Sequence, residues 1–93
     1  MRSYYSIFNC INLFEDKAGY RRGLRKRNSI TRFFVVRGSI RLYVGEDIFD
    51  VNSGEEFHVS GHKWHGYEVV TDAAILQMID DGYEKFYEES KEW

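Results

Sequence analysis

The 93-residue sequence has no proline, a single cysteine and no long hydrophobic run. Because Cys10 is the one thiol, no internal disulfide can form, so packing alone must hold the fold, as is usual in a reducing cytoplasm. The longest apolar runs, residues 33–36 and 73–76, are far shorter than a membrane span or the apolar part of an export signal. We therefore predict a cytoplasmic domain that does not enter a membrane.

Length and composition indicate one globular unit. A hydrophobic share of 43% and a charged share of 30% are those of an ordinary soluble globule, and they exclude a disordered tail or a fibrous repeat. A chain of 93 residues is too short to divide its apolar side chains between two cores. Residues 1–93 are therefore expected to form a single domain.

Charge is segregated along the chain, although the net charge is only −2. Residues 1–43 carry ten Lys and Arg against two Asp and Glu, whereas residues 44–93 carry three against thirteen, so the halves bear +8 and −10. A polarity of this size favours either a cationic face directed at an anion or mutual pairing of the two halves. The sequence leaves both interpretations open.

Short strand patterns separated by turn residues run from Ile30 to Ile79, which is typical of an all-β sandwich or barrel. Gly38 lies between two apolar strand patterns, residues 31–36 and 40–44, and we predict a tight hairpin there because glycine supplies the positive φ. Within residues 56–59, alternation turns His58 away from the side to which Phe57 and Val59 point.

The two ends of the chain have their own patterns. Residues 4–14 are rich in Tyr, Ile and Phe and are expected to be extended, as an edge strand. Tyr83, Phe86 and Tyr87 recur at helical spacing among glutamates, so the sequence predicts a short amphipathic helix over residues 80–93.

The segment GEEFHVSGHKWH, residues 54–65, resembles the second signature of the cupins, in which a histidine three residues after a turn points into a small β-barrel. Residues 33–42 resemble the central hairpin of that family. The similarity covers residues 21–79 and extends to the cupin part of phosphomannose isomerases. It implies an antiparallel, jelly-roll-type β-barrel at residues 21–79, after an extended N-terminal segment at residues 1–20.

The resemblance also implies that the first metal-binding motif is lost. Cupins that hold a metal supply His-x-His and then a glutamate before the central hairpin, and Leu24, Lys26 and Thr31 stand at those positions here. His65 would then stand alone where a transition metal needs three or four ligands. We expect neither a metal nor another cofactor, and if a metal were bound, His65 would be its ligand.

On the same alignment, polar side chains project into an apolar interior. A buried ammonium at Lys26 requires a counter-charge, which an anionic ligand would provide unless the side chain reaches solvent. Guanidinium groups around the mouth would match phosphate oxygens two at a time. The predicted ligand contacts are Lys26, Thr31, Phe33, His65, Tyr67, Arg25 and Arg27. We therefore predict metal-independent binding of a small anionic metabolite, such as a sugar phosphate or nucleotide.

Two other functions stay open. His65 would shuttle a proton in a sugar-phosphate isomerase or epimerase, with Tyr67 or Lys26 polarising an oxyanion, although a lone histidine is more often a hydrogen-bonding group. We therefore expect binding rather than catalysis. The basic run at residues 21–27, taken as a flexible loop, would serve a nucleic-acid or protein adaptor, but the acidic second half of the chain would repel a polyanion.

A homodimer is also expected, because aromatic side chains outside the barrel offer material for an interface. These residues are Tyr4, Tyr5, Phe8, Tyr83, Phe86, Tyr87 and Trp93.

Overall fold

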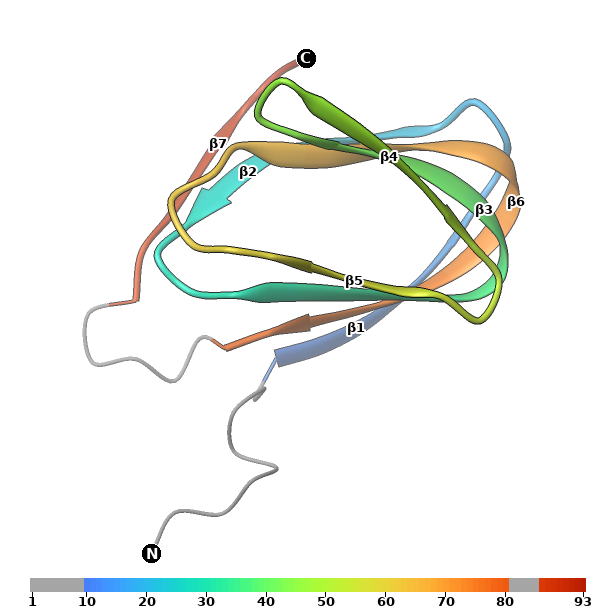
Figure 1. Cartoon of the computed structure of the whole chain (residues 1–93), viewed down its shortest axis with the longest axis horizontal. Coiled ribbons are helices and arrows are strands. Elements are labelled where there is room, and N and C mark those ends of the chain that lie inside the picture. Colours follow the sequence, from blue (N-terminus) through green and yellow to red (C-terminus); the bar gives the residue numbers. More distant parts are fainter. Residues whose placement is uncertain (1–9, 81–85) are drawn as a thin grey trace, which may run out of the picture.

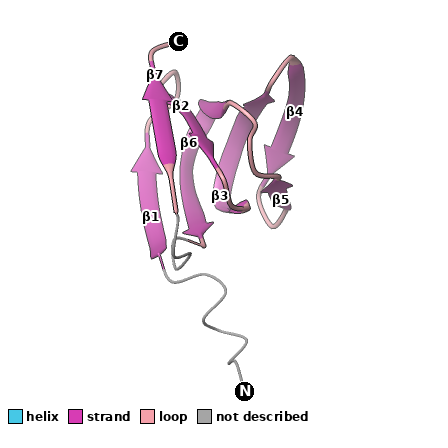
Figure 2. Ribbon diagram, turned by 90° about the vertical axis from the view of Figure 1, so that its left-hand side faces the viewer, coloured by secondary structure: helices cyan, strands magenta, loops and turns pink. Residues whose placement is uncertain are grey.

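The computed structural model describes residues 10–80 and 86–93, and the described chain consists of strands and loops (Figures 1 and 2). The strands are β1 (Cys10–Asp16), β2 (Arg21–Arg27), β3 (Thr31–Val44), β4 (Asp47–Asn52), β5 (Glu56–Val59), β6 (His65–Ile79) and β7 (Glu88–Lys91). Every strand pairing is antiparallel. The all-β prediction is therefore confirmed. None of the described segments is a helix of the length and apolarity that a bilayer crossing requires.

Two long strands, β3 and β6, build both layers of the fold. Residues 31–35 of β3 pair with residues 75–79 of β6, and β5 and β1 add to their two outer sides. Residues 39–44 of β3 pair with residues 65–71 of β6, and β4, β2 and β7 extend that second layer. Figure 1 shows the two layers facing each other, joined where β3 and β6 curve from one to the other.

The hairpin predicted at Gly38 is wrong, because β3 continues through this glycine as one strand of 14 residues. Its register against β6 shifts between Val35 and Arg37, between Arg37 and Ser39, and again before Ile40. Such bulges bend a strand sharply, and Gly38 has a φ of +82° at the bend. A glycine at a bulge and a glycine in a tight turn both need positive φ, so the sequence pattern is the same for both.

The core lies between the layers and follows the predicted alternation. Phe57 is half-buried and Val59 is buried, whereas His58 faces solvent, as expected. The predicted turn after them is also present, with His62 at a φ of +67°. The main buried apolar side chains are Phe33, Val35, Ile40, Leu42, Val44, Val51, Val59, Tyr67, Val69, Ala73 and Ile75.

The C-terminal helix predicted over residues 80–93 is wrong for the part of it that the structure describes. Residues 88–91 form β7, which pairs with β2 so that Lys26 lies opposite Glu89 and Arg27 opposite Glu88. The backbone edge of β2 and these oppositely charged pairs favour a strand over the helix that periodicity suggests. The remainder of the predicted helix, residues 81–85, lies outside the described residues. At the other end, the predicted edge strand is present as β1 over residues 10–16, and its proposed start at residues 4–9 is not described.

The two oppositely charged halves of the chain pair with each other across the strands. The ion pairs between them include Arg21–Glu68, Lys26–Glu89, Arg27–Glu88, Arg32–Glu56 and Arg41–Asp50. Mutual pairing therefore accounts for much of the charge segregation. The exposed pairs add little stability, whereas the pair of Arg27 with Glu88 has a buried member.

Substitution of Gly38 by alanine is expected to destabilise the protein by about 3 kcal/mol or more. A Cβ there would lie 2.2 Å from the carbonyl oxygen of Asp72, and the positive φ adds strain. Gly54→Ala is the matched control, since Gly54 has a φ of +84° and open space around a Cβ, so it is expected to cost only about 1 kcal/mol. Urea unfolding measures both, and equal losses would contradict the role of the bend.

Candidate functional site

A pocket of about 340 Å³ lies within the fold, which is at the lower end of the range for small-molecule sites. Its wall combines aromatic rings with guanidinium, amide and imidazole groups. The lining residues are Cys10, Asn12, Phe14, Arg22, Gly23, Arg25, Arg27, Phe33, His65, Tyr67, Gln77, Ile79, Phe86 and Glu88.

A bulge in β2 directs three arginines into this pocket. The register of β2 against β6 shifts between Arg22 and Arg25, which brings both side chains to the same face although they are three residues apart. Arg27 then follows on that face by ordinary alternation.

Lys26, predicted as a pocket contact, is not among the lining residues. Its Nζ lies 3.7 Å from a carboxylate oxygen of Glu89 and 5.8 Å from the centre of the Trp64 ring. The prediction placed β2 one residue out of register, and a one-residue shift reverses every side chain of a strand.

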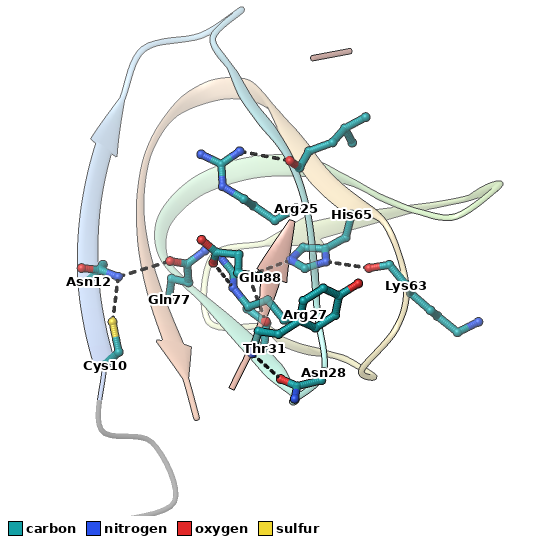
Figure 3. Close-up of polar contacts among 12 residues, drawn as sticks. Cys10, Asn12, Arg25, Arg27, Asn28, Thr31, Lys63, His65, Gln77 and Glu88 are labelled. Atoms are coloured by element: carbon teal, nitrogen blue, oxygen red, sulfur yellow. Dashed lines mark hydrogen bonds and ion pairs between the residues drawn. The ribbon is translucent and has the colours of Figure 1, made fainter. Parts of the chain in front are cut away.

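Arg27 is buried at the centre of a hydrogen-bond network (Figure 3). Its Nε donates to Glu88 Oε2 at 2.6 Å, and its Nη1 donates to Thr31 Oγ1 and to His65 Nε2, both at 3.1 Å. Its Nη2 has no hydrogen-bond partner among the described residues. Thr31, predicted as a ligand contact, is buried and does not line the pocket, so it acts on the pocket by holding Arg27.

His65 is a neutral acceptor in this network. Its Nδ1 donates to the carbonyl oxygen of Lys63 at 3.2 Å, which leaves the lone pair of Nε2 to accept from Arg27. Burial lowers the pKa of His65 to about 4, and the nearby charges of Arg27 and Arg25 contribute to the shift. The imidazole is therefore uncharged at neutral pH.

This donor set does not suit a transition-metal ion. The Nε2 lone pair of His65 is engaged by a guanidinium, whose positive charge would lie beside the metal. No group of three His, Cys, Asp or Glu side chains within residues 10–80 and 86–93 is placed to hold a metal. His58 is exposed and bonds Glu56, so it cannot assist.

Two lining residues beside β1, Arg22 and Tyr67, form a second polar cluster with Asp16, which lies behind the pocket lining. The Tyr67 hydroxyl donates to Asp16 Oδ2 at 2.9 Å and accepts from Arg22 Nε at 3.2 Å. Nη2 of Arg22 donates to both oxygens of Asp16, at 3.0 and 3.2 Å, and its guanidinium lies 3.8 Å from the centre of the Phe14 ring. Burial and then the Asp16 carboxylate raise the pKa of Tyr67, so the phenol stays protonated.

Arg25 differs from the other two arginines because no carboxylate of the described chain pairs with it. Its Nη1 donates to the neighbouring carbonyl oxygen of Leu24 at 3.0 Å, while its side chain lines the pocket (Figure 3). Gln77 is buried on the opposite wall, where its Oε1 accepts from Asn12 Nδ2 at 3.3 Å. Guanidinium and amide donors thus converge on one space.

Five of the seven predicted contacts line this pocket together: Arg25, Arg27, Phe33, His65 and Tyr67. Sequence reasoning missed Asp16 and Glu88. Alternation in β1 from Asn12 through Phe14 would have revealed Asp16. Glu88 was missed because it lies on a strand that was predicted as a helix.

Similarity to known proteins is confined to structure. No protein-family model and no curated protein matches the sequence. The structure is similar to that of a salicylate 1,2-dioxygenase from Pseudaminobacter salicylatoxidans, with a TM-score of 0.78 and 14% identity over 86% of this chain and 24% of that protein. A cupin superfamily protein from Desulfitobacterium hafniense has a TM-score of 0.71 and 19% identity, over 74% of this chain and 63% of that one.

These similarities define the fold class: the chain has a small cupin-like antiparallel β-barrel of the jelly-roll type. The chain spans about a quarter of the length of the dioxygenase, and the identity is low, so the likeness concerns the fold alone. The predicted similarity to phosphomannose isomerases stays a prediction.

The neutral state of His65 predicts a specific pH dependence of stability. Between pH 6.5 and about 4 the unfolded chain binds a proton at this histidine and the folded chain does not, so folding weakens as the pH falls. His65→Gln is expected to flatten the curve of unfolding free energy against pH by up to about 1.4 kcal/mol per pH unit in this window. Denaturant unfolding at a series of pH values measures it. Parallel curves for the two proteins in that window would contradict a buried neutral His65.

Proposed function

We propose that the pocket binds a small anionic metabolite without a metal ion, the class that includes the sugar phosphates and nucleotides expected from the sequence. The observation that carries this proposal is the guanidinium of Arg25, which lines the pocket without a carboxylate partner in the described chain. A half-buried cation without a counter-charge is costly, and an incoming anion would lower that cost.

The rest of the pocket suits such a ligand. Arg27 also lines the pocket, and its bonds to Glu88, Thr31 and His65 involve Nε and Nη1. Guanidinium forks bind carboxylate and phosphate oxygens in pairs. Phe14 and Phe33 supply ring surface for the apolar part of a ligand, and Gln77 supplies an amide. The combination of apolar walls with a few convergent polar groups is typical of small-molecule sites.

Catalysis as an isomerase or epimerase has less support. A general base needs a free lone pair and a pKa near the working pH, whereas His65 gives its lone pair to Arg27 and has a pKa of about 4. Tyr67 is bonded to Asp16 and Arg22 rather than free to donate to an oxyanion.

Nucleic-acid or protein binding through the basic run also has less support. Residues 21–27 form the strand β2 instead of the flexible loop that this function assumed. The cations of this strand either line the pocket or face carboxylates, as Arg21 faces Glu68 and Lys26 faces Glu89.

Arg25→Gln tests the anion site. Isothermal titration with a panel of sugar phosphates, nucleotides, simple carboxylates and matched neutral sugars is expected to show binding of anions only, with EDTA present. Loss of the Arg25 charge should weaken that binding by roughly 10- to 100-fold, as for other hydrogen bonds to charged groups. Arg41→Gln is the matched control, because Arg41 is an exposed residue of β3 paired with Asp50 and does not line the pocket. Equal affinity for Arg25→Gln and wild type would contradict the assignment.

We further propose that the chain forms a homodimer through the outer face of the β1 layer. The aromatic residues expected at an interface do not form this face: Phe86 lines the pocket, Trp93 packs on Tyr43 of the other layer although it stays 43% exposed, and Tyr87 is 41% exposed beside β7. The others, Tyr4, Tyr5, Phe8 and Tyr83, lie outside the described residues.

The outer face of β1 is apolar instead. Ile11 and Leu13 are each 60% exposed and lie beside Met78 and Leu76 in the register, with Phe34 next to Leu76. Charged side chains of both signs surround this apolar centre, in the ion pairs Glu15–Arg37 and Arg32–Glu56. A face with an apolar centre and a rim of both signs is self-complementary, as a two-fold interface requires.

Leu13→Glu is expected to convert the dimer to a monomer, because it buries a charge at the centre of that interface. Size-exclusion chromatography with light scattering measures the mass. Ile48→Glu is the control, since Ile48 is 57% exposed on β4, in the other layer. A monomeric wild type, or a dimeric Leu13→Glu variant, would contradict this interface.

A further inference from the structure

We infer that Glu88 determines the charge of the ligand, so that the pocket accepts a singly charged group such as a carboxylate and disfavours a phosphate monoester. This inference rests on the proposed anion site and narrows its ligand class to singly charged anions, which places the phosphate monoesters among the sugar phosphates and nucleotides outside the preferred ligands. It also identifies Glu88, on the C-terminal strand, as the specificity-determining residue.

Glu88 is the one carboxylate in the pocket lining given by the described residues. Pairing of β7 with β2 sets it opposite Arg27, and its Oε2 accepts from Arg27 Nε at 2.6 Å. Its side chain is 40% exposed, so it lies at the margin between the buried network and solvent. An anion entering beside Arg27 therefore meets a fixed negative charge.

Among the described residues that line the pocket, the charges leave one positive charge to be matched. Arg22 is compensated by Asp16, and Arg27 is compensated by Glu88. His65 is neutral, as its acceptor role toward Arg27 requires. The positive charge of Arg25 remains uncompensated, and the negative charge of one carboxylate would balance it.

A phosphate monoester carries more negative charge than Arg25 alone can compensate. It carries about −1.5 to −2 charges at pH 7, so its second charge would face Glu88 in a site of reduced dielectric constant. A carboxylate presents two oxygens in a plane, which the fork of Arg25 can bind through two parallel hydrogen bonds. Arg27 and Gln77 line the same pocket.

Isothermal titration with four probes that share one phenyl ring tests the inference. Benzoate and methyl phenyl phosphate are monoanions, phenyl phosphate is mostly a dianion at pH 7.5, and benzamide is neutral. Wild-type protein is expected to bind both monoanions at least about tenfold more tightly than phenyl phosphate, and benzamide most weakly. This comparison needs no variant, so it holds even if a substitution impairs folding.

Glu88→Gln then tests the residue itself. The amide keeps an acceptor for Arg27 but removes the charge, so affinity for phenyl phosphate is expected to rise by about tenfold or more, and affinity for benzoate by less. Glu89→Gln is the matched control, because Glu89 is the next residue on β7 and pairs with Lys26 outside the pocket. Glu89→Gln should leave the order of affinities for the four probes unchanged.

The failures of the two proposals are distinguishable. If anions bind and need Arg25, but phenyl phosphate binds as tightly as its methyl ester or Glu88→Gln leaves the affinity ratio unchanged, the role of Glu88 is overturned and the anion site stands. If no anion binds more tightly than benzamide, the anion site itself is wrong and this inference falls with it.

Discussion

The pocket depends on one buried guanidinium. Arg27 connects four strands, because it lies on β2 and bonds Glu88 of β7, Thr31 of β3 and His65 of β6. A charge buried to 4% exposure is tolerable only with such partners, and removal of one of them leaves part of the buried guanidinium without a hydrogen-bond partner. Burial lowers the pKa of His65 and keeps the imidazole neutral, and the contact with Arg27 adds to this effect by engaging its lone pair. Arg27 thus both connects the strands around the pocket and engages the lone pair of its histidine.

Sequence patterns predicted the interior of the fold well, because burial on one face forces alternation. Phe33, His65 and Tyr67 were expected inside and are buried. Which side chains of β2 face the pocket was not predictable in the same way. The bulge of β2 between Arg22 and Arg25 depends on pairing with β6. An error of one residue in the register turns Lys26 toward the pocket in place of Arg27.

Two further errors have a similar cause. Gly38 has the sequence signature of a turn, yet its neighbours on both sides find partners on the continuous strand β6, so the chain bends instead of reversing. The spacing of Tyr83, Phe86 and Tyr87 in the sequence suits a helix. The open edge of β2 and its basic side chains nevertheless favour a strand at Glu88 and Glu89. Local patterns cannot report such long-range pairing, and Glu88 was missed as a pocket residue for that reason.

A cupin-like barrel does not by itself specify an activity, since function resides in the side chains of the site. In this chain the histidine that the cupin resemblance directs inward meets an arginine, and the pocket carries guanidinium and amide donors. The most direct measurement is a crystal structure of the protein grown with benzoate and with zinc and iron salts present. We expect a carboxylate on the guanidinium of Arg25, with His65 Nε2 still accepting from Arg27. A metal ion on His65 Nε2 with Arg27 displaced would contradict it.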